Sequence, residues 1–427
     1  MIALNPYKTI TQGKVCLMSL PEKEWALLRT LAETLRTAAE SEIQRERTAL
    51  WYAHNDLTPG TRPLVFCDPE GGWREIVREA DLLCETERGR AIERELRIRT
   101  FYASMRHDRV DSAVWRVGYA HTNSGWGLSP EMHRSKPTGA ASWTAPIRDY
   151  AEDMRLLHAP EITVDADETR RRLEFYTELF DGILSVELFS SWWWSLGLTQ
   201  TFVYLRGLEQ MMYDMYDEPE NVHALMRFLS DGTMRMLDFL EENRLLFPNN
   251  GDTYVGSGGF GWTKQLPQSG FAGATRLKNM WGFAESQETV NISPDMFEEF
   301  IFPYQLPILK RFGLNCYGCC EPLDKRWHVV QKIPSLRRVS VSAWADFGRM
   351  AELLGGDYVY SCKPNPALLA APELDEDAVR AYLRPIVSVC RAHGCRLELI
   401  MKDCHTIGGN PQNVLRWCEI ASDEAQR

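Results

Sequence analysis

Short apolar runs alternate with amphipathic segments along the chain from about residue 184 to its end. The apolar runs have the length of strands and are bounded by glycine, proline or polar residues, whereas the segments between them have helical spacing. Repeated strand–helix units are typical of a parallel sheet covered by helices, and they predict an α/β fold in the form of a parallel barrel. The expected strands are 184–189, 277–283, 314–317, 338–341, 358–361 and 397–401.

Two of the expected helices have clear start signals. Ser293 followed by Pro294 is an N-cap followed by proline at the first helical position, and Asp217 is the expected N-cap of a helix over 219–243. The helix that starts at Pro294 is expected to run to about residue 312. The other helices of this part are predicted over 165–179, 199–216, 375–392 and 411–421.

The first part of the chain has a different pattern. Residues 20–56 place leucines at helical spacing, which predicts a helix or a pair of helices. Strands are expected over 62–67, 114–120 and 141–146. Residues 1–110 are therefore expected to form an N-terminal helical extension packed on a barrel of residues 111–427.

Polar side chains follow four of the expected strands at the point where each strand ends. In a parallel barrel the carboxyl ends of the strands meet on one face, and reactive groups collect there. Random placement would scatter these residue types over both faces and the outer helices. The residues at the four strand ends are Glu285 and Glu288; Cys319, Cys320 and Glu321; Lys363 and Asn365; and Asp403, Cys404 and His405.

Two of these strand ends carry soft or borderline metal ligands. A set of thiolate, imidazole and carboxylate groups suits zinc in four-coordinate geometry, provided that the two strands are neighbours. Packed core thiols are the alternative, because cysteine is among the most buried residue types. Cys404 and His405 are adjacent, so only one of them is expected to bind metal. Side chains alternate in direction along a strand, and this alternation, continued past residue 401, points Cys404 inward. The opposing argument favours His405, because burying an imidazole that binds nothing is costly.

Composition excludes several classes of function. The net charge is −11 without a basic block, so no nucleic-acid partner is expected. No apolar run approaches the roughly 20 residues of a membrane span, and the first residues have no signal-peptide pattern. The chain has 11 cysteines, and this odd number favours reduced thiols in a cytoplasm over a disulfide framework.

Two motifs resemble a known family. Residues 215–225 (MYDEPENVHAL) resemble a helix pair of the uroporphyrinogen decarboxylase superfamily, and residues 291–304 (NISPDMFEEFIFPY) resemble its S-P-x-x-F-x-x-F-x-x-P-Y signature. The resemblance covers about residues 180–420, with both motifs in the family's order. It implies a (β/α)8 TIM barrel.

The superfamily contains metal-free decarboxylases of porphyrinogen acetates and zinc-dependent methyltransferases that use a corrinoid. The decarboxylases carry an R-Q-A-G-R loop, which this sequence lacks. The methyltransferases carry H-x-C-G after one strand and a second cysteine before the final helix. By this resemblance Cys320 falls on the first cysteine, Gly318 replaces the histidine, and Cys404 falls on the second cysteine. Glu321, Cys319 or His405 would complete the zinc ligands.

The resemblance thus implies a methyltransferase of the O-demethylase type. It would move a methyl group from a small methylated substrate, with an aryl methyl ether as the leading candidate, to the cobalt of a corrinoid protein. A separate corrinoid partner is expected because no D-x-H-x-x-G segment is present. Zinc would act as a Lewis acid, and Glu285, Glu288 or Asp403 would protonate the leaving oxygen. The residues expected to contact substrate are Asp252, Lys363 and Asn365.

Two alternatives remain open on the sequence. One is a metal-free decarboxylase of a small or tetrapyrrole carboxylic acid, which would act without a partner. The other is a binding barrel without catalytic activity, which predicts a packed mouth without perturbed titratable groups. The sequence is compatible with an oligomer as well as with a monomer.

Overall fold

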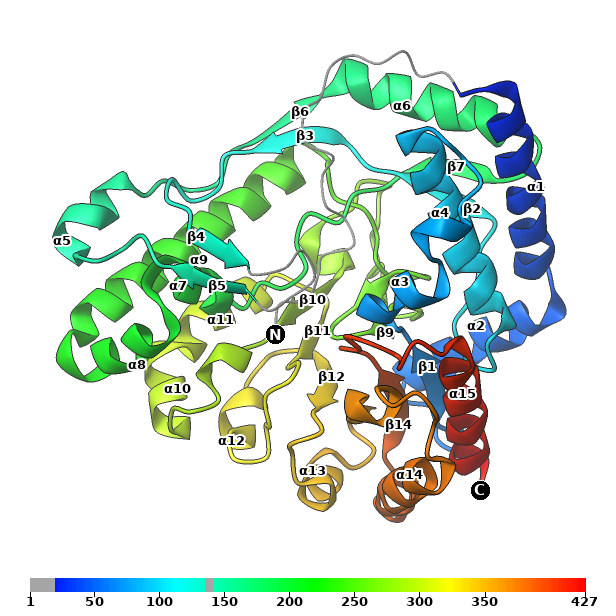
Figure 1. Cartoon of the computed structure of the whole chain (residues 1–427). Coiled ribbons are helices and arrows are strands. Elements are labelled where there is room, and N and C mark those ends of the chain that lie inside the picture. Colours follow the sequence, from blue (N-terminus) through cyan, green and yellow to red (C-terminus); the bar gives the residue numbers. More distant parts are fainter. Residues whose placement is uncertain (1–19, 135–140) are drawn as a thin grey trace. The chain divides into compact units, whose positions relative to one another are not determined.

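The computed structural model describes residues 20–134 and 141–427, in which helices and strands alternate (Figure 1). Internal contacts divide the chain into two compact units. The first unit contains His121–Val164 and Ser191–Tyr360. The second contains the described residues up to Ala120, together with Asp165–Ser190 and Ser361–Arg427. Each unit is therefore assembled from segments that lie far apart in the sequence.

Three parallel strands lie side by side at the centre of the first unit. Trp281 of the first strand lies opposite Leu314 of the second, and Cys316 of the second lies opposite Arg338 of the third. Every residue of the first two strands is buried, including Asn315, whose Nδ2 donates to the Leu309 carbonyl oxygen at 3.0 Å. Cys316 packs in this core. The strands, in spatial order, are β10 (Trp281–Ala284), β11 (Leu314–Tyr317) and β12 (Leu336–Val341).

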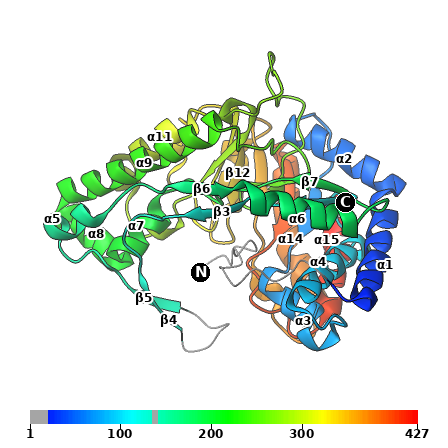
Figure 2. The same cartoon turned by 90° about the horizontal axis from the view of Figure 1, so that it is seen from above.

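Helices and short strand pairs complete the first unit. The long helix α9 packs against α8 and α11, and Figure 2 shows these helices alongside it. The helices are α5 (Tyr150–Asp153), α7 (Thr199–Arg206), α8 (Leu208–Asp217), α9 (Pro219–Glu242), α10 (Pro294–Phe300), α11 (Phe302–Leu309), α12 (Trp327–Val330) and α13 (Phe347–Leu354). The short strands are β3 (Ala120–Asn123) with β6 (Ile162–Asp165), β4 (Glu131–Arg134) with β5 (Ala141–Thr144), and β8 (Tyr254–Val255) with β9 (Gly259–Phe260).

The helices of this unit lie at the predicted positions, but two segments that were each predicted as one helix are interrupted. The segment predicted as one helix over 199–216 is interrupted at Gly207, whose φ of 100° does not fit a helix. The helix predicted from Pro294 to about 312 is divided at Ile301. Pro303, which lacks a backbone N–H, lies in the first turn of the second piece. Ser293 caps the first piece as predicted, with its Oγ accepting the N–H of Met296 at 3.1 Å.

Two boundaries differ from the predictions. Asp217 is the last residue of α8 rather than the N-cap of α9; Glu218 occupies the cap position and makes no side-chain cap bond. The strand predicted over 277–283 begins with a 3-10 turn at Leu277–Asn279, so β10 starts only at Trp281. The apolar pattern therefore identified both segments but not the residues at which they start.

The second unit also contains parallel strands. Strand β1 pairs with β14 in register, with Leu64 opposite Glu398 and Cys67 opposite Met401. Another parallel pair, β2 with β7, lies in the same unit. The strands are β1 (Leu64–Cys67), β2 (Val114–Val117), β7 (Ser185–Leu188) and β14 (Arg396–Met401), and the unit resumes within β13 (Val359–Cys362) next to β14.

The structure describes seven helices in the second unit. Two of them lie within residues 20–56, where a helix or a pair of helices was predicted, and this prediction is confirmed. The helix predicted over 165–179 is present, and Asp165 is its N-cap, because the Asp165 Oδ1 accepts the N–H of Glu168 at 2.9 Å. Helices α1 and α4 pack together, as do α14 and α15 (Figure 1). The helices are α1 (Glu22–Ala39), α2 (Glu42–Asn55), α3 (Trp73–Ile76), α4 (Glu87–Ser104), α6 (Ala166–Leu179), α14 (Glu376–Ala392) and α15 (Pro411–Gln426).

The parallel strand pairs and the many helices confirm the predicted α/β class. Closure of the strands into a (β/α)8 barrel stays a prediction, and so does a boundary between an extension and a barrel at residue 110. Among the residues that the structure describes, no helix has both the length and the apolar composition needed to cross a membrane.

Candidate active site

Glu285 follows β10 directly and is 1% exposed. Its Oε1 accepts the hydroxyl of Ser195 at 3.0 Å, and its Oε2 accepts the N–H of Gln287 at 3.1 Å. The carboxyl group is thus held in place from two sides inside the first unit. This is the position predicted for a reactive group at the carboxyl end of a parallel strand.

Glu321, four residues after β11, is completely buried. Its Oε1 accepts the N–H of Ser286 at 2.8 Å, and its Oε2 accepts the N–H of Cys319 at 2.9 Å. Both oxygens of the carboxyl group are therefore engaged by the backbone. Through these bonds Glu321 joins the loop after β10 to the loop after β11.

Glu285, Glu288 and Glu321 influence one another's protonation. Burial raises the pKa of Glu285 well above its ordinary range, and repulsion from Glu288 and Glu321 raises it further. Burial, with a contribution from Cys319, raises the pKa of Glu321 to about 7. Burial also raises the pKa of Glu288, although the Thr199 hydroxyl, which donates to Oε2 at 2.7 Å, opposes this. Burial and the neighbouring carboxyl groups therefore favour the protonated form of Glu285, which can act as a proton donor.

The two adjacent thiols lie in the same loop as Glu321. Cys319 is 2% exposed, whereas Cys320 is partly exposed, and their Sγ atoms are 3.5 Å apart. The hydroxyl of Ser257, in the turn between β8 and β9, donates to the Cys319 Sγ at 3.2 Å. The glycine-rich residues 256–261 thus belong to a hairpin whose turn contacts a thiol of the candidate site. Asp252 lies just before this hairpin and is partly buried.

Uncharged hydrogen bonds support the carboxyl end of β10. The Gln305 Nε2 donates to the carbonyl oxygens of Gly197 and Glu285 at 2.6 and 3.0 Å. The hydroxyl of Tyr317 donates to the Gln305 Oε1 at 2.8 Å. Neither Gln305 nor Tyr317 was predicted as a site residue from the sequence. The signal for Gln305 was a single amide in an otherwise apolar helix, directly after the Pro-Tyr of the family-like motif.

In the second unit, Lys402 and Asp403 follow β14. The Lys402 Nζ lies 3.3 Å from the Asp403 Oδ1 and 3.9 Å from the Glu70 Oε1. The Glu70 Oε2 accepts the Asp403 N–H at 3.0 Å. Burial raises the pKa of Glu70 to about 8, although Lys402 opposes the shift. Asp403 is therefore fixed beside a carboxyl group that holds a proton at neutral pH.

Cys404 and His405 differ in exposure. Cys404 is 2% exposed and its Sγ lies 3.7 Å from the Lys402 carbonyl oxygen. Burial raises the pKa of this thiol well above its ordinary value. His405 is exposed, and its carbonyl oxygen accepts an Arg74 Nη2 hydrogen bond at 2.6 Å. Strand β14 ends at Met401, so the alternation of side-chain direction along the strand does not extend to Cys404 or His405.

A buried chain of polar groups runs through the second unit. The Glu398 Oε2 lies 3.0 Å from the Nε2 of His54, and its Oε1 accepts the hydroxyl of Ser361. The Ser361 Oγ in turn accepts a hydrogen bond from the Lys363 Nζ. We call these four residues the β14 relay. His54 and Ser361 were not identified as site residues from the sequence.

The remaining predicted substrate residue has a local structural role. The Asn365 Oδ1 accepts the Ala367 N–H at 3.0 Å and so caps the 3-10 helix Pro366–Leu369. Lys363, two residues earlier, is only 5% exposed. Of these two predicted substrate residues, Lys363 is therefore the one whose side chain lies in the interior of its unit.

The predicted zinc ligands divide between the units: Cys319, Cys320 and Glu321 belong to the first, and Cys404 and His405 belong to the second. Within residues 20–134 and 141–427, no group of three or more His, Cys, Asp or Glu side chains is placed to hold a metal ion. The paired thiols of Cys319 and Cys320 nevertheless suit a soft-metal site chemically. Glu321 fits less well, because both of its oxygens already accept backbone N–H groups.

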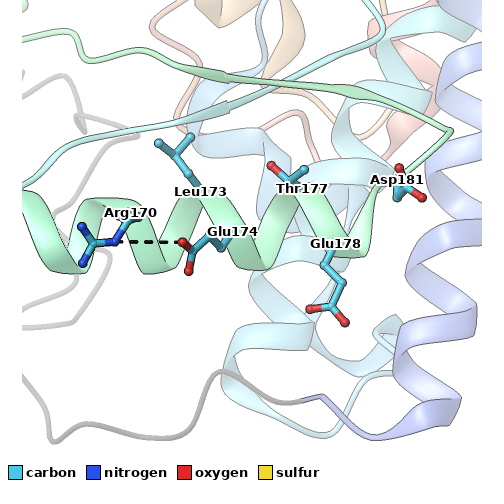
Figure 3. Close-up of a pocket in the computed structure, with 6 residues that line it drawn as sticks. All are labelled: Arg170, Leu173, Glu174, Thr177, Glu178 and Asp181. Carbon is cyan, nitrogen blue, oxygen red and sulfur yellow. Dashed lines mark ion pairs between the residues drawn. The ribbon is translucent and has the colours of Figure 1, made fainter.

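The second unit has two surface hollows that do not contain the predicted site residues. Figure 3 shows one of about 480 Å³ along α6, where Arg170 and Glu174 form an ion pair of 4.0 Å. The other, of about 650 Å³, is lined by residues of α2 such as Gln44 and Tyr52, together with Asp111. None of the described residues that line either hollow is a predicted site residue. The candidate site is therefore defined by its buried polar groups.

Comparison with models of protein families gives no match, and no curated protein matches the chain. Among solved structures, the chain is similar to one described as a methyltransferase from Methanosarcina mazei. The similarity covers 89% of this chain and 99% of that chain, with a TM-score of 0.49 and 12% sequence identity. At this score and identity, neither the fold nor the activity of that protein is transferred to this chain.

Proposed function

We propose that the protein is a methyltransferase that moves a methyl group from a small methylated substrate to the cobalt of a corrinoid held by a partner protein. An aryl methyl ether is the first candidate for the methyl donor. The observation that carries the proposal is the buried Glu285 at the carboxyl end of β10, whose pKa is raised by burial and by repulsion from Glu288 and Glu321. The corrinoid and the reaction type rest on the resemblance of the sequence to the methyltransferases of the uroporphyrinogen decarboxylase superfamily.

An ether oxygen that loses its methyl group leaves as an alkoxide or phenoxide and needs a proton. The raised pKa of Glu285 favours its protonated form, because its anion would be desolvated and repelled by Glu288 and Glu321. Ser195 and Gln287 fix the direction of its carboxyl group. Once it has donated, the anion is in an unfavourable position and recovers a proton readily. Glu288 is the second candidate acid in the same unit, and Asp403 beside Lys402 is the candidate in the other.

The candidate zinc ligands are Cys319, Cys320 and Glu321 in the first unit and Cys404 and His405 in the second, and a bound zinc ion would supply Lewis-acid activation of the leaving oxygen. Cys320 is the most accessible of these thiols that the structure describes, because it is partly exposed whereas Cys319 and Cys404 are buried. Asp252, Lys363 and Asn365 are proposed to contact the methyl donor.

The first experiment supplies both substrates. Purified protein is mixed with 2-methoxyphenol and free reduced cobalamin, and formation of the phenol and of methylcobalamin is followed. We expect demethylation that depends on the cobalamin. Carbon dioxide release from an added carboxylic acid, without cobalamin and after treatment with a chelator, would instead identify a metal-free decarboxylase.

A paired variant then tests the role of Glu285. Glu285→Gln keeps the size of the side chain but cannot donate the proton. Glu298→Gln, an exposed glutamate of the same unit that pairs with Lys332, is the matched control. If the two variants have equal demethylation rates, Glu285 is not the acid of this reaction.

A further inference from the structure

Helix α14 ends in a turn that brings two cysteines together. The N–H of Cys395 donates to the carbonyl oxygen of Cys390 at 2.8 Å, and the N–H of Gly394 donates to that of Arg391 at 3.1 Å. Gly394 between them has a φ of +67°, in the left-handed region. These two bonds and the left-handed glycine define a Schellman motif at the helix end.

In this motif the side chains at the two ends of the longer bond face each other, and they usually form an apolar contact. Here both positions are cysteines, and the side chain of Cys390 makes a hydrogen bond with that of Cys395. Cys390 is 1% exposed, whereas Cys395 is half-buried and accessible to small solutes. The backbone turn therefore holds an inner thiol directly beneath an outer one.

A cation is fixed next to the outer thiol. The Arg396 Nη1 donates to the carbonyl oxygen of Gly394 at 2.8 Å, and its Nε donates to that of Leu57 at 3.3 Å. The hydrogen bond from Cys390 and the charge of Arg396 lower the pKa of Cys395 below its ordinary value, although burial opposes this. A thiol with a stabilised thiolate and partial exposure is the type that reacts with peroxides.

We propose that Cys390 and Cys395 are a site of reversible oxidation, at which a hydroperoxide converts the two thiols into an intramolecular disulfide. This site is independent of the proposed methyl transfer. It is carried by the geometry of the turn, the contact between the two side chains and the unequal exposure of the two sulfur atoms.

The reaction balances with hydrogen peroxide as the oxidant. The Cys395 thiolate attacks one peroxide oxygen, the O–O bond breaks, and hydroxide leaves, which gives a sulfenic acid on Cys395. The Cys390 sulfur then attacks the Cys395 sulfur, the S–O bond breaks, and water leaves once the thiol proton has been transferred. The two thiols lose two electrons in all, and the peroxide is reduced to two molecules of water.

The same unit contains an internal control. Cys67 and Cys418 also form a thiol–thiol hydrogen bond, but both are 0% exposed, and burial raises the pKa of Cys67 well above its ordinary value. Contact between two sulfurs is therefore common to both pairs, whereas solvent access and a lowered pKa are found at Cys395 and not at the buried Cys67. Peroxide should oxidise Cys390 and Cys395 and leave Cys67 and Cys418 unchanged.

The test uses mass spectrometry on the full chain. Protein is treated with hydrogen peroxide, its remaining thiols are blocked with N-ethylmaleimide, and it is digested with trypsin under non-reducing conditions. Because Arg391 lies between the two cysteines, trypsin separates them, and only a disulfide keeps their peptides joined. We expect a joined peptide pair after peroxide, its disappearance after reduction with dithiothreitol, and unjoined peptides for Cys67 and Cys418.

Two variants determine the order of events. In Cys390→Ser, peroxide should leave Cys395 as a sulfenic acid that dimedone labels, and in Cys395→Ser the dimedone label on Cys390 should be at least tenfold weaker. The wild-type measurement needs neither variant, so a folding defect in one of them does not affect it. Full blocking of Cys395 by N-ethylmaleimide after peroxide, or joining of Cys395 to another cysteine, would overturn the proposal.

Discussion

The Glu321 carboxylate accepts the backbone N–H of Ser286 at 2.8 Å and so ties together the loops that follow β10 and β11. The same carboxylate accepts the N–H of Cys319, so a single buried side chain bonds to both loops that carry the candidate site of the first unit. Its removal should affect stability and site geometry together.

Glu321→Gln tests this connection through stability. The glutamine amide presents an N–H group to one of the two backbone donors, which leaves that donor unsatisfied in a buried place. We expect a loss of about 1–3 kcal/mol in the free energy of unfolding, measured by urea denaturation at pH 7. Glu298→Gln, at an exposed position, should change it by less than about 0.5 kcal/mol. An unchanged urea midpoint for Glu321→Gln would show that the two bonds do not stabilise the fold.

The pH dependence of stability should show the raised pKa of Glu321. Its pKa is about 7 in the folded state and 4.5 as the ordinary value, so the folded state binds the proton more tightly. This contribution is fully present below about pH 4.5 and is lost as the pH rises through about 7. Compared with Glu321→Gln, the wild-type protein should therefore lose stability between these two pH values. A constant difference between the two proteins across this interval would contradict the shift.

Loss of the proton donor at position 285 should depend on the leaving group. For Glu285→Gln we expect the rate of demethylation to fall by roughly 100-fold or more with a weakly acidic phenol as the leaving group. With a methyl ether of a nitrophenol, which leaves without protonation, the loss should be much smaller. Equal losses with both ethers would indicate that Glu285 positions groups rather than donating a proton.

Metal content tests the two thiol positions. Protein purified without chelators should contain about one zinc ion per chain, and Cys320→Ser should lose it. Cys404→Ala and His405→Ala should both reduce activity, and only one of them should abolish zinc binding. Emission spectrometry of the three variants measures the metal directly. If Cys404→Ala and His405→Ala both keep full zinc and full activity, the second half of the proposed metal site does not exist.

The β14 relay gives a further prediction for stability. Glu398→Gln removes the negative charge to which the buried Lys363 is linked through the Ser361 hydroxyl, and it replaces one of the two acceptor oxygens by an amide N–H group. We expect a loss of about 1–3 kcal/mol in the free energy of unfolding. The double variant Glu398→Gln/Lys363→Met should lose less than the sum of the single variants, because the buried charge is then also absent. Glu33→Gln, on the exposed face of α1, is the control. Additive losses in urea denaturation would show that the two charges do not interact.

Sequence patterns identified the parallel strands and their polar ends correctly, because a strand buried on both faces is a continuous apolar run and the polar residues after it stand out. Glu285 and Glu321 were found in this way. Gln305, Tyr317, His54 and Ser361 were missed because each is positioned by a hydrogen bond to a residue far away in the sequence. The pattern also did not show that Gly207 and Ile301 divide two helices, since apolar residues at helical spacing continue on both sides of each interruption.

The pairing of β1 with β14 has a consequence for synthesis of the protein. On the ribosome, Leu64–Cys67 emerges long before its partner Arg396–Met401, because the two strands lie far apart in the sequence. The hydrogen-bonding edge that β14 later covers must remain unpaired in the nascent chain throughout that time, which is when an apolar strand is most open to aggregation. The second unit can therefore complete its fold only after translation has passed Met401, and a chaperone that holds the early strand during this interval should increase the yield of folded protein.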